Sequence, residues 1–537
     1  MNAKLLSTAL LAMSATAVMA QAEPNLDTYI GAQLATKDLN GTARYVGMGG
    51  AMEALGADLS TMSTNPAGMG LFRKSQASAS FGLNVQGDGK SFGEGTPTNA
   101  SFDQLGVVLS ARAGATSYVN FGFNFHKSRN FDYVLSAANS ALNGSSLSRQ
   151  TYVKALRGDL DENAAGNLVH PYRESQVDQL SYRIIDQYDP ANPSQYLETI
   201  SPDAVNYQMD RAHTGYIGEY DFNISGNINN RVYLGLTLGI HAVHYHAYSE
   251  YIENFTPLAA YPGIVYAKYS DRQDITGTGY DVKAGIIVRP LEESPWRIGA
   301  SIATPTWYKL TADNYTTISD QYGVVDNIND NIEFGMNTPW EFGLSTGYTI
   351  GKEWALGASY SYADYGALDM RNITERYYDY WDDTYTTSSA SDTNMKRLTE
   401  RTLSGVHTVK LGAEYRPDDL LSLRLGYNYV SPMYKTSGMR DQTIDSPGVY
   451  MASTSDYTNW GDTHRVTAGV GFSFDHFRLD FAYQYSTTAG DFYPYMSSLT
   501  GSSVDNTGAA LTVTNAAEAV KVHQNRHQLL CSLNYIF

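Results

Sequence analysis

The feature that most constrains the fold is a two-residue alternation of apolar and polar side chains. At the C-terminal end, Leu533, Tyr535 and Phe537 alternate with Ser532 and Asn534. The same alternation is found in the segments 354–362, 421–429, 466–474 and 477–485. A period of two places successive side chains on opposite faces of an extended chain, so these segments are predicted to be strands with one apolar face.

The polar face of these strands separates a soluble sandwich from a membrane barrel. It carries Gly, Ser, Thr, Asn and charged residues, as expected for strands that line a wet lumen. The apolar rows end in Tyr, Phe or Trp and span about 9–11 residues, which matches a tilted strand that crosses a bilayer. A transmembrane β-barrel is therefore favoured over a sandwich.

The connections between strands support the same architecture. We expect fourteen strands, near 77–86, 101–112, 116–126, 213–227, 231–248, 265–289, 296–311, 339–350, 353–364, 406–416, 420–434, 463–474, 477–487 and 526–537. Short and long connections alternate, which is typical of outer-membrane barrels with short periplasmic turns and long outer loops. The fold class predicted is all-β, a 14-stranded antiparallel transmembrane barrel.

Composition excludes other classes of protein. The chain has 37 Lys and Arg against 55 Asp and Glu, a net charge of −18, which argues against a nucleic-acid partner. Cys531 is the single cysteine, so no intramolecular disulfide and no cysteine-based metal site is expected. Two Gly-x-Ser-x-Gly sequences occur, Gly89–Gly93 in an expected connection and Gly343–Gly347 inside an expected strand. Neither stands at a strand-to-helix turn, and we expect no enzyme activity, cofactor or metal.

The N-terminus predicts export. Residues 1–20 combine Lys4, an apolar stretch and a small-residue end, which is the pattern of a signal peptide. We expect cleavage after Ala20, with Ala22 as the alternative. With the barrel pattern, this predicts the outer membrane of a Gram-negative bacterium, with membrane lipid as a partner.

Residues 21–75 do not alternate and are predicted to form a plug, or hatch, inside a barrel formed by residues 76–537. The segment contains Gly41–Gly50, rich in small residues, and Asn65–Gly70. Small residues allow close backbone packing, and Pro66 fixes a turn.

This segment resembles the hatch of the FadL/TodX family of outer-membrane transporters. The resemblance rests on Gly50-Ala51, Asp58, Ser60 and Asn65-Pro66-Ala67-Gly68-Met69, placed directly before the first strand. It implies a monomeric, plugged, fourteen-stranded barrel that carries long-chain fatty acids or other hydrophobic compounds without ATP. It also implies lateral exit of the cargo through a kink in the third strand.

Asn65, Pro66 and Ala67 match the family's hatch motif, and Gly68 and Asp58 complete it here. The long segments 127–212 and 365–405 and the pre-hatch segment 21–40 depart from the family. In the third strand, the kink candidates are Asn120, Gly122 and Asn124, because Gly and Asn disfavour strands. An ordinary glycine beside the plug is the alternative.

Further site residues are predicted from position. Apolar loop residues are candidates for a cargo groove, with simple loop packing as the alternative: Leu258, Tyr261, Ile264, Val265 and Tyr450. Charged residues of the plug and the lumen wall are candidates for latches, since buried charges need partners: Arg44, Glu53, Glu341, Lys410, Glu414 and Arg424. The terminal Phe537 is expected to be the insertion signal for the barrel assembly machinery.

The predicted function is passive transport of hydrophobic compounds, with long-chain fatty acids as the preferred cargo. Three alternatives stay open: a surface receptor or adhesin, a type IX secretion shuttle that binds protein cargo, and a haem receptor using His244 and His246. His241 falls on the opposite face of the same strand by parity, which disfavours one metal bound by all three histidines.

Overall fold

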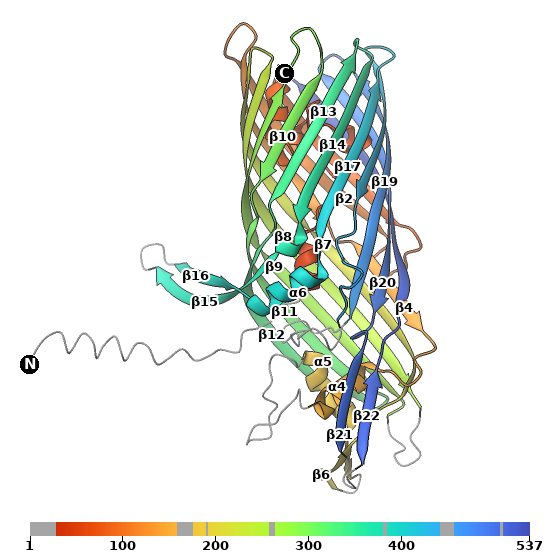
Figure 1. The fold of residues 1–537 in the computed structure, drawn as a ribbon. Coiled ribbons are helices and arrows are strands. Elements are labelled where there is room, and N and C mark those ends of the chain that lie inside the picture. The colour runs from red at the N-terminus through yellow and green to blue at the C-terminus, as the bar shows by residue number, and fades with distance from the viewer. Residues whose placement is uncertain are drawn as a thin grey trace, which may run out of the picture.

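The computed structural model describes residues 28–157, 175–189, 192–256, 264–379, 384–440, 456–504 and 509–537. These residues form a closed antiparallel barrel (Figure 1), and its wall consists of fourteen strands. In order around the wall these are β1 (Gln76–Gln86), β2 (Thr98–Arg112), β3 (Tyr118–Asn130), β7 (Ala204–Ile228), β8 (Val232–Phe255), β9 (Tyr266–Val288), β10 (Arg297–Ala303), β13 (Glu341–Ile350), β14 (Trp354–Asp364), β17 (Gly405–Tyr415), β18 (Leu421–Val430), β19 (Tyr457–Ser473), β20 (Phe477–Tyr493) and β23 (Val520–Ile536). The ring closes where β23 pairs with β1, from Gln76 opposite Ile536 to Gln86 opposite Arg526. Each predicted strand is found, so the predicted barrel is confirmed.

Strand β8 shows how side chains divide between the two faces of the wall. Leu234, Leu236 and Leu238 are 47–49% exposed on the outside, whereas Tyr233 and Thr237 are 2% and 0% exposed on the inside. Rows of exposed apolar residues continue on neighbouring strands, including Phe222 and Ile224 on β7. A continuous apolar band of this kind suits contact with lipid. Among the described residues, no helix is long and apolar enough to cross a membrane.

Several strands continue past the predicted ends. Strand β7 already begins at Ala204, inside the segment expected to be a loop, and 312–338 is mostly the hairpin of β11 (Trp307–Asp320) and β12 (Gly323–Asn337). The strand predicted at 296–311 is divided between β10 and β11. Pro305 lies in the interruption, where it cannot donate a ladder hydrogen bond.

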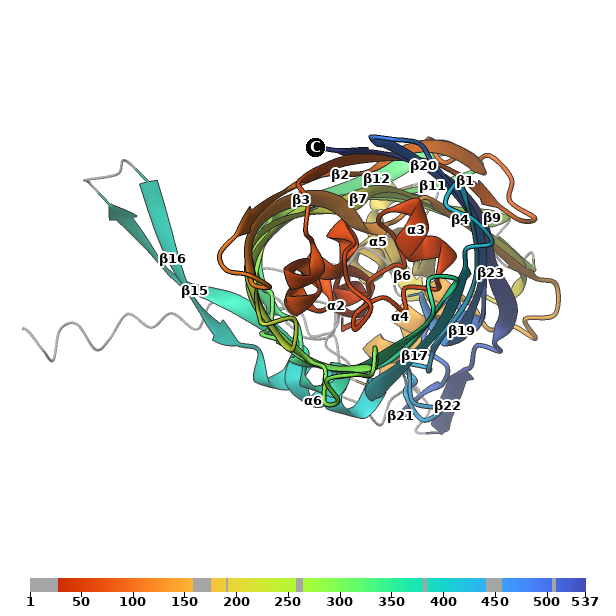
Figure 2. The same cartoon turned by 90° about the horizontal axis from the view of Figure 1, so that it is seen from above.

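Shorter elements gather at the end of the barrel opposite the C-terminus and beside the wall. They are β4 (Tyr133–Asn139), α4 (Leu147–Leu156), α5 (Gln176–Ile185), β5 (Asp186–Asp189), β6 (Asn192–Thr199), η3 (Tyr365–Ala367), β15 (Asp369–Asp379), β16 (Thr384–Ser391), α6 (Thr393–Thr402), β21 (Leu499–Val504) and β22 (Ala510–Asn515). The β15–β16 hairpin projects away from the wall in both views (Figures 1 and 2).

Residues 28–72, here called the lumen segment, lie inside the ring when the barrel is viewed along its axis (Figure 2). The segment contains α2 (Thr28–Ala35), α3 (Ala43–Gly47) and the 3₁₀ helices η1 (Leu59–Ser63) and η2 (Pro66–Leu71). Its backbone passes close to the wall: a Cβ atom on Gly47 would lie 3.3 Å from the Cα of Gly469 on β19. Glycines on both sides therefore allow this packing.

Candidate functional site

The Asn65-Pro66-Ala67-Gly68 motif forms a capped turn against the wall. The Asn65 side chain accepts a hydrogen bond from the Ala67 N–H (3.1 Å), and Pro66 occupies the first position of η2, where its missing N–H costs nothing. A methyl group on Gly235 of β8 would collide with the Pro66 carbonyl, and one on Gly285 of β9 with the Asn65 side chain. The wall is thus shaped to the motif.

Asp58 organises the lumen segment internally. It caps η1 by accepting a hydrogen bond from the Ser60 N–H (3.0 Å), and its carboxylate also accepts from the Thr42 hydroxyl (2.8 Å). Thr42 in turn caps α3 by accepting from the Tyr45 N–H. The carboxylate therefore joins two parts of the segment that are sixteen residues apart in sequence.

The predicted latch residues are brought together across the lumen. Arg44 of the segment forms a two-point ion pair with Glu414 on β17 (3.0 and 3.2 Å), and Glu53 pairs with Lys410 (2.7 Å). Arg424 also contacts Glu414 (2.6 Å), from the wall side. Glu341 pairs with Lys37 of the segment (2.9 Å), a residue that the sequence analysis did not select. These contacts fit the latch prediction, whereas the latch role itself stays a prediction.

A cavity of about 330 Å³ lies in the lumen between the segment and the loop end of the barrel. This volume is within the range of about 300–1,000 Å³ that is usual for small-molecule sites. Its lining includes a large aromatic group: Tyr29, Phe131, Tyr133, Tyr245, Tyr365, Tyr434, Tyr457 and Trp460. It also includes charged side chains, so the cavity is amphipathic.

Three arginines surround one carboxylate in one part of the charged lining, which elsewhere includes Lys37, Arg211, Glu219, Asp271, Glu341, Lys410 and Asp456. Asp38 of the lumen segment is contacted by Arg129 (3.0 Å), Arg526 (3.6 Å) and Arg465 (4.0 Å), which come from β3, β23 and β19. The Asn130 N–H also donates to Asp38 (2.9 Å). Burial opposes ionisation of the Asp38 carboxyl, but the arginines outweigh it and hold its pKa below the ordinary value. One carboxylate among three guanidinium groups leaves this part of the cavity positively charged.

The aromatic and cationic parts are separated along the strands. On β19, Tyr457 and Trp460 precede Arg465 from the loop end inward, and Phe131 and Tyr133 follow Arg129 toward the loop end. Tyr133 packs edge-on against Trp460 (6.0 Å between ring centroids). The cavity thus offers aromatic surface nearer the loops and guanidinium groups beyond it.

The strand ladders do not break at the kink candidates Asn120, Gly122 and Asn124, and their role stays a prediction. The pairing of β3 with β2 and with β7 is continuous through these residues, and the register shift falls between Lys127 and Arg129. Asn120 points inward and donates to the Met69 carbonyl (2.7 Å), which joins the lumen segment to the wall, and Asn124 accepts from Gln104 (2.7 Å) of the neighbouring strand. Gly122 leaves room for the methionines Met62 and Met69 of the lumen segment.

The two described residues of the predicted cargo groove do not line the cavity. Ile264 packs against a core cluster at the loop end, and Val265 is 45% exposed; neither lines the cavity. Both stand at the loop-end start of β9, beyond the cavity, which explains the difference. Leu258, Tyr261 and Tyr450 lie outside the described residues.

The remaining predicted residues are on the outside or at the seam of the barrel. His244 is exposed, and His246 pairs with Asp274; neither lines the cavity, whereas His241 faces inward as parity predicted. Phe537 donates its N–H to the Ser75 carbonyl (3.0 Å) next to the β1–β23 seam and is 61% exposed. Its role in insertion stays a prediction.

No protein-family model matches the chain, and no curated protein matches it. Solved structures that it is similar to include a Pseudomonas aeruginosa FadL homologue, with 12% identity, 93% of this chain and 99% of that chain covered, and a TM-score of 0.48. The Ralstonia pickettii toluene transporter TbuX has 11% identity and a TM-score of 0.46, with 93% of this chain and 99% of that chain covered. The Pseudomonas putida toluene transporter TodX has 10% identity and a TM-score of 0.45, with 94% of this chain and 100% of that chain covered. The group named by these structures is the one that the sequence motif resembles. The likeness assigns no substrate to this chain.

Proposed function

We propose that this chain is an outer-membrane transporter of hydrophobic compounds and that its cargo is an amphipathic anion, with long-chain fatty acids as the preferred class. The observation that carries the proposal is the amphipathic cavity. Its aromatic part can bury an apolar chain, at about 25 cal/mol per Å² of apolar surface. Its three arginines can bind a carboxylate through charge-assisted hydrogen bonds.

In this proposal the cargo carboxylate competes with Asp38 for the arginines. Asp38 belongs to the lumen segment, whereas the arginines belong to the wall. Binding of a carboxylate at the arginines therefore weakens one attachment of the segment, which acts as the hatch. No ATP or covalent step is needed, because the cargo moves down its own gradient.

Release into the bilayer through the wall is part of the proposal. The strand ladders favour the interruption between β10 and β11 as the exit, because Pro305 lacks a ladder donor there. The ladders of β3 are continuous at Asn120–Asn124, and that position is not proposed.

The test compares two substitutions with opposite expected effects, in the barrel reconstituted in lipid nanodiscs with a fluorescent long-chain fatty acid. Arg465→Gln removes one guanidinium and is expected to weaken binding about tenfold, since a hydrogen bond to a charged group contributes about 1.5–3 kcal/mol. Asp38→Asn removes the competing carboxylate and is expected to tighten binding. Arg231→Gln, an exposed arginine paired with Glu292 outside the cavity, is the control and should leave binding unchanged.

The carboxylate must be required as well as the arginines. The methyl ester of the same fatty acid should bind the native barrel about tenfold more weakly than the acid and should bind Arg465→Gln and the native barrel equally. Equal binding of acid and ester to the native barrel would remove the carboxylate from the proposal and leave a carrier of neutral hydrophobic compounds.

A further inference from the structure

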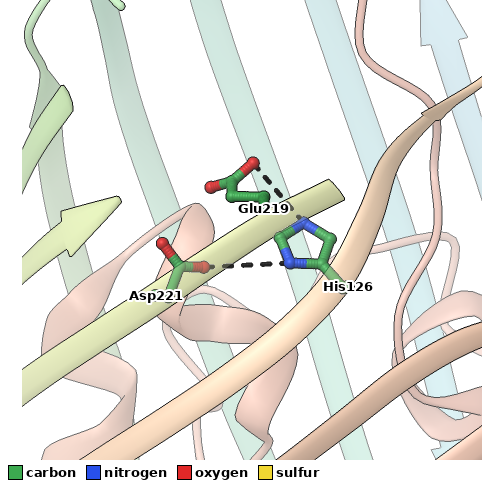
Figure 3. Close-up of side chains that lie close together, drawn as sticks. All are labelled: His126, Glu219 and Asp221. Carbon is green, nitrogen blue, oxygen red and sulfur yellow. Dashed lines mark ion pairs between the residues drawn. The ribbon is translucent and has the colours of Figure 1, made fainter. Parts of the chain in front are cut away.

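Six ionisable side chains from four adjacent strands meet on the inner face of the wall. His126 lies on β3, Glu219 and Asp221 on β7, His241 on β8, and Asp281 and Lys283 on β9; together they are called the inner-wall cluster. All six are between 0 and 5% exposed. Figure 3 shows His126 facing the two carboxylates of β7. None of the six belongs to the Asp38 group or to a latch pair, although the Lys37 ammonium interacts electrostatically with Glu219 and Asp281.

Lys283 supports the three carboxylates from one side. Its ammonium contacts Glu219 Oε1 (2.8 Å), Asp281 Oδ1 (2.6 Å) and Asp221 Oδ1 (3.4 Å). It therefore uses one oxygen of each carboxylate. The second oxygens of Glu219 and Asp221 face His126, and the second oxygen of Asp281 faces His241.

The second oxygens of Glu219 and Asp221 face imidazole nitrogens at distances too long for hydrogen bonds. His126 Nε2 lies 3.6 Å from Glu219 Oε2, and His126 Nδ1 lies 3.8 Å from Asp221 Oδ2 (Figure 3). Asp221 Oδ2 has no hydrogen-bond partner. One donor atom from each of His126, Glu219 and Asp221 lies within 4.8 Å of the other two.

His241 places a fourth electron-pair donor near the same oxygen of Glu219. Its Nε2 is bonded to Asp281 Oδ2 (3.0 Å), which as a carboxylate accepts, so the neutral ring carries its lone pair on Nδ1. That Nδ1 has no hydrogen-bond partner and lies 3.8 Å from Glu219 Oε2. A carboxylate that fixes a histidine through its other nitrogen is the usual second layer of a metal site.

The net charge of the cluster favours a cation between these atoms. With all three carboxyl groups ionised and both imidazoles neutral, the three carboxylates and one ammonium carry two net negative charges in a buried site, which is costly without a partner. A divalent cation balances that charge. His126 and Glu219 also line the lumen cavity, which gives an ion a path to the site.

We propose that the inner-wall cluster binds one divalent first-row transition-metal ion of the Zn²⁺ class through His126, Glu219 and Asp221, with His241 as the fourth donor. Imidazole with carboxylates is a donor set for such ions. Donor atoms around tetrahedral Zn²⁺ lie about 3.3–3.6 Å apart, so the side chains need to close by about 1 Å. Lys283 keeps its contacts, because it holds the opposite oxygens. This inference does not depend on the transport proposal.

The test uses the full chain purified without a histidine tag, stripped with EDTA and dialysed. Titration with Zn²⁺, followed by metal analysis after a second dialysis, is expected to give one equivalent per chain. Co²⁺ is expected to give the intense visible absorption of a four-coordinate ion. Mg²⁺ should bind at least tenfold more weakly, because the site contains imidazole.

Glu219→Gln is the main variant and should weaken Zn²⁺ binding at least a hundredfold. Glu253→Gln is the matched control: it makes the same change in another fully buried carboxylate of the neighbouring strand, one that accepts hydrogen bonds from Ser146 and Ser148. Binding should be unchanged there. Folding is checked by the heat-dependent gel shift of barrels, and His126→Gln replaces Glu219→Gln if the latter does not fold.

Less than a fifth of an equivalent of Zn²⁺ bound to the native chain overturns the proposal. Protonation of His126 and His241 would then be what balances the negative charge of the inner-wall cluster. Stoichiometric binding that survives in the folded Glu219→Gln or His126→Gln chain also overturns the proposal, since the ion then lies elsewhere.

Discussion

Asn65 shows how one side chain couples a turn of the lumen segment to the wall. It caps η2, and Gly285 of β9 leaves the space in which its side chain lies. Loss of a cap of this type costs about 1 kcal/mol, which is small beside the closed ladder of the barrel. The residue therefore bears on the position of the segment more than on the existence of the barrel.

Asn65→Ala is expected to leave the barrel folded and to slow uptake of a labelled long-chain fatty acid severalfold. Uptake is measured in a Gram-negative host that lacks its own transporter and is normalised to the amount of protein at the surface. Unchanged uptake at normal abundance would remove the motif from the mechanism.

At this scale the sequence predicts the inward charged residues of the strands, but it does not predict Asp38, which their arginines contact. Parity along the strands places Lys410, Glu414 and Arg424 inside, and their pairs with Arg44 and Glu53 follow. Asp38 carries no such signal, because it lies in a segment without alternation. Arg129 falls beyond the expected end of the third strand at 126, so the arginine group around Asp38 could not be assembled from the sequence.

At the level of elements, contact between the lumen segment and the wall depends on glycines. Gly235, Gly357 and Gly412 each face backbone of the segment, and a side chain at any of them would collide with it. Gly→Ala substitutions here therefore press on the segment without altering the hydrogen bonds of the strand.

Gly235→Ala is expected to displace η2 while the barrel still folds, and to raise the permeability of the outer membrane to a bulky antibiotic severalfold. The control is Gly226→Ala on the adjacent strand, where the added carbon would be 3.3 Å from the Tyr118 carbonyl oxygen and away from the segment. Equal permeability in the two variants would show that η2 does not seal the lumen.

Alternation found each wall strand but not its full length. Within the apolar band, lipid-facing residues such as Leu234 and Leu236 contrast with the lumen face, so the period is clear. Beyond the band both faces are polar, as in β11, where Asp313 and Asn314 are neighbours. The outer parts of β7 and β8 therefore have the composition of loops, whereas β9 was predicted over its full length. The division of β10 from β11 follows from Pro305, which the alternation alone does not reveal.

At the level of the whole molecule, the C-terminus lies at the seam that closes the barrel. Phe537 is exposed and is held beside β1 through Ser75. Deletion of Phe537 is expected to reduce outer-membrane insertion severalfold, as measured by membrane fractionation and the heat-dependent gel shift. Phe537→Tyr keeps an aromatic end and should insert normally, whereas normal insertion of the shortened chain would contradict the prediction.

The seam between β1 and β23 also dictates an order of events. Residues 28–72 are synthesised before every strand, yet Ala43 donates its N–H to Ser532 (2.6 Å), 489 residues later in the chain, and Arg44 awaits Glu414. Because contacts of such sequence separation form slowly, these contacts of Ala43 and Arg44 stay unmade until the later strands arrive. The segment must then be inside before the last two edges meet. Closing the wall and enclosing the segment are thus one kinetic step, and a chain stalled before β23 would expose two strand edges and a segment that lacks its contact with Ser532.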